Sequence, residues 1–244
     1  MIVNDRKGQW EIIFQRNHAL LAGKIALALK PVLRPPHWPE TLLSIMDHDD
    51  GQNDLGRVEH TTEEGYPKGF RAYDFHLEQA ERVVNIARRK SQWIFLLISM
   101  HAHAIRKDVE PKTEELRCFL DAQLAHQKRL RNYFGISESD ANKAYLFLRW
   151  CDECSLILCE NRLDTSGKCE QIGEIPGIGP VEICRISDTE YAVSPWCFSE
   201  NRCDISAETY LLTEQTFLSS RALKEALNRM LPTQKKYILT ARTV

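Results

Sequence analysis

The sequence carries little net charge and no long apolar run. Its 32 lysines and arginines nearly balance 34 aspartates and glutamates, so the formal net charge of -2 gives no bulk attraction to nucleic acid or to an anionic membrane. The longest uninterrupted apolar run, Trp93 to Ile98, is far too short to span a bilayer, and the charged N-terminal residues contain no apolar signal region. We therefore expect a cytoplasmic protein with no membrane partner and no general nucleic-acid partner.

Nucleotide-binding and secretory signatures are also missing. Neither a Walker A sequence nor a dinucleotide-binding glycine fingerprint occurs in the chain. All eight cysteines lie within residues 118–203, and in a chain without a secretion signal we expect reduced thiols rather than disulfides. The Cys-x-x-Cys formed by Cys151 and Cys154 has no second such pair, so we interpret these cysteines mainly as small buried residues.

Apolar residues recur at helical spacing over the first two thirds of the chain, and β-prone runs bounded by turns occur at both ends. The helical period, capping residues such as Ser91, and stops at Pro31, Gly51 and Gly135 delimit the predicted helices. Short alternating runs predict the strands. The predicted helices span about 17–30, 40–48, 75–90, 91–108, 113–134, 137–159 and 213–230, and the predicted strands 181–186, 190–194 and 205–212, besides a hairpin in 2–14.

These elements predict a mainly α fold, a helical bundle with a small antiparallel β-sheet formed by the N-terminal hairpin and the C-terminal strands. We expect a single domain over residues 1–244, with a helical core at about 15–162 and a β-containing part at about 168–244 that includes hairpin 1–14. Such a sheet would bring the two chain ends together. Residues 50–73 hold four glycines and no sustained period, which predicts a long functional or mobile loop.

Asp152 stands out because it lies on the apolar face of a predicted helix. Leu148 precedes it by four residues and Leu156 follows it by four, so an unpaired carboxylate here would cost several kcal/mol. A metal ion is one partner that would remove this cost. The ordinary alternatives are an arginine partner, such as nearby Arg149, or a helix-capping role, and for an isolated aspartate these are favoured.

Three further residues change this balance. His18 lies in the first turn of a predicted helix, and the His48-Asp49 pair lies at the end of the next helix, where both side chains can face one ion. Together with Asp152 they provide two imidazoles and two carboxylates, a ligand set that suits Mn, Fe, Co, Ni, Zn or Mg. We therefore predict that His18, His48, Asp49 and Asp152 bind a divalent metal ion.

The order of this quartet resembles the HD-domain superfamily of metal-dependent phosphohydrolases. That superfamily places one His on an early helix, a His-Asp doublet on the next helix and a final Asp on a later one. The doublet's context in residues 43–51, LSIMDHDDG, looks like the family's apolar helix that ends in His-Asp and Gly. The resemblance implies an HD-like helical fold and hydrolysis of a phosphate ester.

A closer resemblance, to a bacterial family of unknown function, covers nearly the whole chain. It suggests His101 as a further site residue and implies no substrate. The stretches that carry it are Ile2-Val3, Gln15 to Gly23, His48 to Gly51, Gly65-Tyr66-Pro67 with Phe70, Leu97 to His101, Asp152 with Ser155-Leu156 and Leu158-Cys159, and Ser194-Pro195-Trp196.

His101 and Asp50 are the candidate catalytic residues. His101 ends an apolar helical run; alone it would be read as a core histidine bonded to a carbonyl, but beside the quartet it is a candidate general acid, phosphate ligand or extra metal ligand. Asp50 follows the doublet and is a candidate base or a residue that orients a metal-bound water. A solvated loop aspartate is an equal alternative.

The long loop contains candidate substrate-binding residues. Arg57, Lys68 and Arg71 carry cations that pair well with phosphate and are placed to close over a small anionic substrate, although a solvated charged loop is the commoner outcome. His60 and His76 are lesser candidates of the same kind as His101.

The leading functional hypothesis is a metal-dependent hydrolase that acts on a phosphate ester. The metal would lower the pKa of a bound water and polarise the phosphoryl oxygen, while His101 or a loop cation stabilises developing charge. One alternative is an HD-type di-iron oxygenase, with His60, His76 and His101 as additional ligands. Another is a non-catalytic metal- or ligand-binding protein. The sequence gives no expectation of the oligomeric state.

Overall fold

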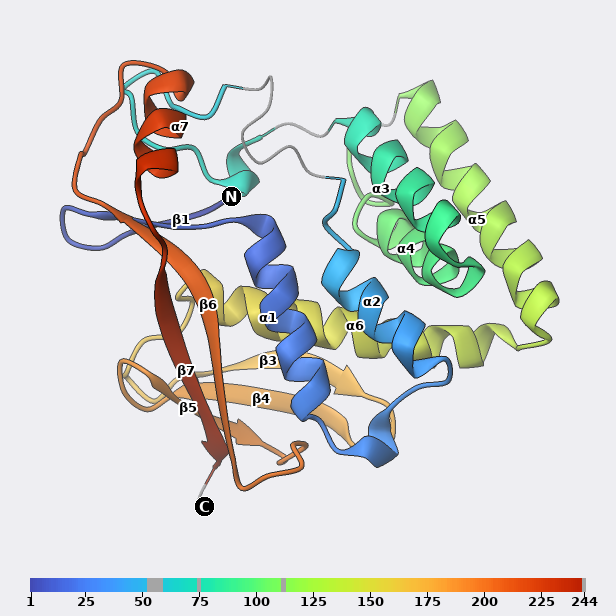
Figure 1. The fold of residues 1–244 in the computed structure, drawn as a ribbon. Coiled ribbons are helices and arrows are strands. Elements are labelled where there is room, and N and C mark those ends of the chain that lie inside the picture. Colours follow the sequence, from blue (N-terminus) through green and yellow to red (C-terminus); the bar gives the residue numbers. More distant parts are fainter. Residues whose placement is uncertain (52–58, 74–75, 111–112, 243–244) are drawn as a thin grey trace.

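The computed structural model describes residues 1–51, 59–73, 76–110 and 113–242. Figure 1 shows helices gathered beside a long curled sheet. The helices are α1 (Gln15–Ala28), α2 (Trp38–Asp47), α3 (Leu77–Lys90), α4 (Gln92–Ala104), α5 (Glu114–Phe134), α6 (Glu138–Cys159) and α7 (Ser220–Arg229), and the strands are β1 (Ile2–Asp5), β2 (Trp10–Ile13), β3 (Cys169–Ile175), β4 (Gly179–Arg185), β5 (Glu190–Ser194), β6 (Arg202–Leu212) and β7 (Thr233–Ala241).

The predicted helices α1 to α6 are present, and local capping explains several of their ends. The Ser91 hydroxyl accepts a hydrogen bond from the backbone N–H of Trp93 at the start of α4, and Thr113 does the same for Leu116 at the start of α5. Gly135 ends α5 in the left-handed conformation with φ 63°. The C-terminal helix is shorter than predicted, because α7 begins only at Ser220.

The prediction of a mainly α fold with a small antiparallel sheet is wrong. The sheet has seven strands in the order β1-β2-β6-β7-β5-β4-β3, and it is mixed, because β5 and β7 run parallel. The N-terminal hairpin does join it, since β2 pairs with β6. Figure 1 shows β3, β4 and β5 running across the long strands β6 and β7, so that the sheet curls into about half a barrel.

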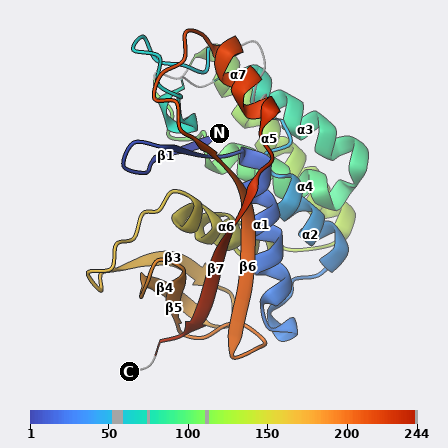
Figure 2. The ribbon, with the colours of Figure 1, turned by 60° about the vertical axis from the view of Figure 1, so that its left-hand side comes forward.

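Two strands that the sequence pattern did not predict account for the larger sheet. β3 contains Gly173 and a register shift between Gln171 and Gly173, which interrupt its alternation. β7 begins with four polar residues, and only Tyr237 and Leu239 are buried within it. β7 lies between β6 and β5, and the chain ends lie far apart (Figures 1 and 2), so the expectation that the sheet brings the chain ends together is also wrong.

The helices form layers against this sheet. α1 packs on β6, α6 packs on β3, and the two helices also contact each other. α4 is buried from Trp93 to Ala102 and is packed against α2, α3, α5 and α6. Figure 2 shows α1 and α6 between the sheet and helices α2 to α5. Helices α1, α2, α4 and α6 therefore meet in the interior, on the side away from the sheet.

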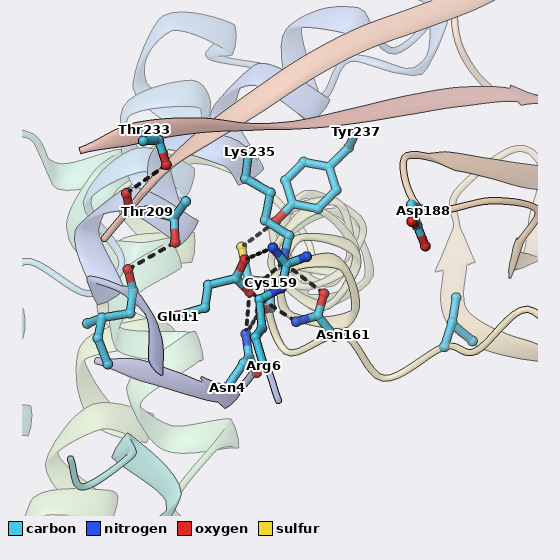
Figure 3. Close-up of polar contacts among 12 residues, drawn as sticks. Asn4, Arg6, Glu11, Cys159, Asn161, Asp188, Thr209, Thr233, Lys235 and Tyr237 are labelled. Carbon is cyan, nitrogen blue, oxygen red and sulfur yellow. Dashed lines mark hydrogen bonds and ion pairs between the residues drawn. The ribbon is translucent and has the colours of Figure 1, made fainter. Parts of the chain in front are cut away.

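A buried polar network ties the N-terminal hairpin to β7 and to the end of α6 (Figure 3). Glu11 is fully buried, and Lys235 Nζ lies 2.7 Å from its Oε2 atom. Asn4 and Asn161 also donate side-chain hydrogen bonds to Glu11, and Asn4 donates a second one to the carbonyl of Cys159. Because a buried carboxylate is costly without partners, this network fixes how the hairpin docks.

Two of the cysteines are joined, contrary to the expectation of reduced thiols. Cys169 and Cys184 form a disulfide between β3 and β4, where the two residues face each other across the antiparallel pair. This pairing depends on the register of β3 against β4, which the sequence pattern does not predict. Within the described residues, no helix is both long enough and apolar enough to cross a membrane.

Candidate metal centre

Four helices bring five side chains of metal-ligand type to one point. His18 lies in the first turn of α1, and His48 and Asp49 directly follow α2. His101 lies in the last turn of α4, and Asp152 lies near the middle of α6. All but Asp49 are buried, with at most 8% of the residue surface exposed. The quartet predicted from the sequence is thus brought together, and His101 lies beside it.

The separations of the facing atoms suit a shared ion. His18 Nε2 lies 3.4 Å from Asp49 Oδ2 and 3.3 Å from Asp152 Oδ1. His48 Nε2 lies 3.7 Å and 3.2 Å from the same two oxygens. Two atoms that each bind one ion at about 2.1 Å lie about 3.0–3.4 Å apart in octahedral or tetrahedral geometry. Each of these four nitrogen–oxygen separations is therefore close to the spacing that one ion requires, while Asp49 and Asp152 fall in different groups of mutually close ligand atoms.

Several polar atoms of the five side chains have no hydrogen-bond partner within the part of the chain that the structure describes. They are both ring nitrogens of His18, Nδ1 of His101, and Oδ1 of Asp152, all of them buried. Buried polar atoms are normally paired, and each unpaired one costs about 1–3 kcal/mol. A cation among His18, His101 and Asp152 would remove this cost, so the donor set fits a divalent metal ion.

His48 is held in an orientation typical of a metal ligand. Its Nδ1 atom lies 2.7 Å from the carbonyl oxygen of Ile45, one turn earlier in α2, so Nδ1 carries the proton that it donates. In the neutral ring the Nε2 lone pair then faces Asp49 and Asp152. Metal-binding histidines commonly donate their other ring N–H to a carbonyl in this way, which fixes the ring.

Without an ion, the two carboxylates of the cluster favour a proton on His48. Burial alone would lower the pKa of His48, but the carboxylates of Asp152 and Asp49 raise it to about 10. Burial would raise the pKa of Asp152, but His48 and contacts with His18 hold it well below its usual value. Burial and the neighbouring charge of His48 lower the pKa of His101 to about 4. A metal ion would take the place of the proton on His48.

The ligand atoms form two overlapping groups. In one group, atoms of His18, His48 and Asp49 all lie within 4.8 Å of one another, and in the other the same holds for His48, His101 and Asp152. The rings of His48 and His101 are 5.2 Å apart between centroids. His101 therefore belongs to the cluster by position, as an additional ligand or as a residue that contacts whatever the ion binds.

The cluster lies in the wall of a cleft of about 680 Å³, a volume typical of small-molecule sites. Arg149 and Lys107 also line the cleft, and neither forms an ion pair with any described carboxylate. Buried Arg106 lies close to Asp49, although burial lowers its pKa to about 10. The opening of the cleft thus carries these cations together with the exposed carboxylate of Asp108, while its buried end carries the carboxylates of the cluster.

Other residues predicted from the sequence are placed differently. The carboxylate of Asp50 points to Lys90, 2.9 Å away, and Asp50 is not among the residues that line the cleft. Arg71 lines the cleft, but Glu160 neutralises it through two hydrogen bonds of 2.6 and 2.9 Å. Asp50 and Arg71 are therefore committed to other partners.

Two further loop residues, His60 and Lys68, contact Tyr73, which lines the cleft. The ammonium of Lys68 lies 4.9 Å from the centre of the Tyr73 ring, and His60 Nδ1 lies 2.7 Å from the Tyr73 hydroxyl oxygen. His60 and Lys68 thus reach the cleft only through this tyrosine. Exposed His76 precedes α3 and belongs to neither ligand group, and Arg57 lies outside the described residues.

Sequence reasoning named Arg149 only as an alternative partner of Asp152, and it missed Tyr145 on α6 and Lys107 beyond α4 as residues that line the cleft. Tyr145 precedes Asp152 by seven residues and Arg149 by four, so all three share one face of α6. This spacing could have identified Tyr145 as a further neighbour of Asp152. Lys107 follows α4, and no sequence signal pointed to it.

Comparison with known proteins identifies the family but no activity. A search of curated proteins and a search of solved structures found no match to the chain. The resemblance to the HD-domain superfamily is wrong, because the matching family is a different one and the fold contains a curled seven-stranded sheet rather than an HD-domain helical bundle. The matching family model is described as "Protein of unknown function (DUF3891)" and covers residues 1–214, so the chain belongs to the DUF3891 family.

Proposed function

We propose that this protein is a metal-dependent hydrolase of a small phosphate ester. The observation that carries the proposal is the cluster of His18, His48, Asp49 and Asp152, whose facing atoms are 3.2–3.7 Å apart at the buried end of a cleft. The ligand set of nitrogen and carboxylate oxygen favours Mn, Fe, Co, Ni or Zn, with Mg as a further candidate. A small anionic substrate and a cytoplasmic location are part of this proposal.

Two cations that line the cleft support an anionic substrate. Arg149 and Lys107 have no carboxylate partner among the described residues, so they are available to pair with phosphate oxygens. Arg149 lies one turn before Asp152 on the same face of α6, which places its side chain over the buried cluster. In this proposal, Arg149 and Lys107 bind the phosphate, a role that the sequence analysis assigned to the loop residues Arg57, Lys68 and Arg71.

The proposed reaction is hydrolysis of a P–O bond. A bound divalent ion would supply a water of lowered pKa and polarise the phosphoryl oxygen. The water oxygen forms a bond to phosphorus, the ester P–O bond breaks, and the alcohol leaves with a proton. Arg149 and Lys107 orient the phosphate and offset its charge, and His101, at the inner wall, contacts a phosphate oxygen or completes the ligand set.

One observation favours an alternative, the oxidation of a substrate by two irons. The second group of ligand atoms, from His48, His101 and Asp152, provides part of a second site. His60 and His76, which that alternative would need as ligands, belong to neither group found among the described residues. Hydrolysis with one ion is therefore the better-supported function.

Metal analysis combined with an activity assay tests the proposal. Protein purified without added metal should hold one divalent ion per chain, and should hydrolyse 2-naphthyl phosphate after reconstitution with Mn²⁺ or Zn²⁺. Asp152→Ala should lower both the bound metal and kcat/KM at least about 100-fold. Asp50→Asn serves as the matched control, because Asp50 is adjacent to the ligands but paired with Lys90.

Each other outcome has a defined meaning. Two irons per chain would favour oxidation. Wild-type protein that holds no metal, together with unchanged fold and metal content in Asp152→Ala, would refute every catalytic form of the proposal and leave a ligand-binding module.

A further inference from the structure

Tyr145 is a buried tyrosine in the wall of the metal cleft, and its hydroxyl has no partner among the described residues. It lies on α6, is 8% exposed and lines the cleft. Buried tyrosine hydroxyls usually find a hydrogen-bond partner. Unlike the unpaired ligand atoms, the hydroxyl oxygen of Tyr145 is not sealed from solvent, so it remains accessible from the cleft.

The second tyrosine of the cleft, Tyr73, is bonded differently. Its hydroxyl oxygen lies 2.7 Å from His60 Nδ1 and 3.3 Å from the carbonyl oxygen of Lys68. These contacts use the hydrogen-bonding capacity of Tyr73 within the protein. Of the two tyrosines, only Tyr145 therefore offers its hydroxyl to a molecule in the cleft.

The spacing along α6 brings Tyr145 near the residues that would hold the ion and the phosphate. Tyr145 precedes Asp152 by seven residues, about 10 Å along the helix, with Arg149 between them on the same face. The Tyr145 ring also contacts His101, with the ring centroids 6.2 Å apart. Burial raises the pKa of Tyr145 to about 12, Arg149 opposes this rise and Asp152 adds to it, so at neutral pH the hydroxyl is a hydrogen-bond donor.

The proposed hydrolysis determines where such a donor is useful. Water activated by the ion would attack phosphorus from the side of the ligands, and the attacking and leaving oxygens of phosphoryl transfer lie roughly in line. The leaving oxygen therefore points away from the ligand cluster. Arg149 and Lys107 are assigned to the other phosphate oxygens. Tyr145, two helical turns from Asp152, is an uncharged donor at a distance from the ion that suits the leaving oxygen.

We propose that the Tyr145 hydroxyl donates a hydrogen bond to the leaving oxygen of the phosphate ester and stabilises the negative charge that develops on it. This inference rests on the proposed function. As the water oxygen bonds to phosphorus, the ester P–O bond breaks and its electron pair stays on the leaving oxygen. The hydroxyl keeps its own proton, and the alkoxide takes one from solvent to match the one that the attacking water releases. Esters of ordinary alcohols, which leave poorly, are the substrate class that such a donor favours.

Two phosphate esters with unequal leaving groups test this role. In phenyl phosphate the developing charge stays largely on the oxygen, whereas the nitro group of 4-nitrophenyl phosphate spreads it over the ring. Removing one preorganised donor to a developing charge typically lowers kcat about 100-fold or more. In metal-reconstituted protein, Tyr145→Phe should therefore lower kcat about 100-fold for phenyl phosphate and less than about tenfold for 4-nitrophenyl phosphate, with little change in KM.

Tyr73→Phe is the matched control. It removes the hydroxyl of a tyrosine that lines the same cleft but is bonded elsewhere, so any change in kcat should be the same for both esters. Tyr145→Phe should keep one ion per chain and an unchanged midpoint of urea unfolding, because the lost hydroxyl has no partner among the described residues. Wild type provides a second measurement: its kcat values for the two esters should differ by less than about tenfold.

The outcomes separate this inference from the proposed function. An equal loss of kcat for both esters in Tyr145→Phe would overturn the role of Tyr145 and leave metal-dependent hydrolysis standing, as would a lowered unfolding midpoint with such an equal loss. The same holds if wild-type kcat for phenyl phosphate is more than about 100-fold below that for 4-nitrophenyl phosphate. No hydrolysis of either ester by wild-type protein that holds its ion would sink the proposed function, and this inference with it.

Discussion

Replacing Asp152 by asparagine should remove most of the stabilisation that a divalent ion gives to this protein. Asp152 Oδ1 lies 3.3 Å from His18 Nε2 and 3.2 Å from His48 Nε2, closer to both imidazoles than the Asp49 oxygen is. Asparagine keeps the volume of the side chain but removes the charge. A neutral amide oxygen binds a divalent ion less tightly than a carboxylate oxygen does.

The size of the effect follows from binding linkage. An ion that binds only the folded chain adds about 2.7 kcal/mol to its stability at a free concentration of 100 times Kd. If the substitution weakens binding about 100-fold, the same ion concentration adds only about 0.4 kcal/mol. For a chain of this length about 1 kcal/mol changes Tm by about 2–4 °C, so the increase in Tm should fall from about 5–11 °C to about 1–2 °C.

Thermal unfolding with and without Mn²⁺ or Zn²⁺, against a chelator blank, measures this difference. Asp50→Asn is the control and should keep the full increase in Tm, because Asp50 lies outside the cleft and pairs with Lys90. A full metal-dependent increase in Asp152→Asn would refute the assignment of Asp152 as a ligand. Loss of the increase in Asp50→Asn alone would place the ion elsewhere.

Three further predictions concern other parts of the molecule. Glu11→Gln breaks a buried ion pair and should lower the free energy of unfolding by about 3–5 kcal/mol at neutral pH. Burial opposes ionisation of Glu11, but Lys235 lowers its pKa below 4.5. In urea unfolding, the difference between the variant and wild type should therefore shrink as the pH falls below 4.5. Reducing the Cys169–Cys184 disulfide, whose residues are 15 apart, should cost about 3 kcal/mol in the same assay, and thiol titration of the unreduced protein should find six thiols rather than eight. Arg149→Ala should raise KM for 2-naphthyl phosphate about tenfold with a smaller change in kcat, whereas Arg89→Ala, which is exposed and away from the cleft, should not.

One candidate ligand could be predicted from its local environment, and the others from their residue type and their order along the chain. Asp152 falls between Leu148 and Leu156 on an apolar helix face, so its burial and its need for a partner follow from the helical period alone. His18 and His48 lie at the ends of helices whose starts and stops are clear in the sequence. Their convergence with Asp152 was an expectation, and the structure brings them together.

Helical periodicity alone does not distinguish Asp49 from Asp50, and only the His-Asp doublet favours Asp49 as the ligand. Both follow α2, and the choice between them depends on which way the chain turns after the helix. Asp49 faces His18, while Asp50 faces Lys90, which lies 40 residues later at the end of α3. The packing of α3 against the end of α2 is a long-range contact that no spacing within residues 43–51 reveals.

The prediction of the fold is wrong because two strands lack the pattern that marks a strand, each for its own reason. In β3, Gly173 and the bulge beside it interrupt the alternation of buried and exposed residues. β7 begins with four polar residues and buries only Tyr237 and Leu239. Both strands depend on partners elsewhere in the chain, since β7 lies between β5 and β6 and β3 packs on α6. The helices that carry the candidate ligands can therefore be predicted from local periodicity, whereas the full sheet becomes visible only once its strands pair and pack.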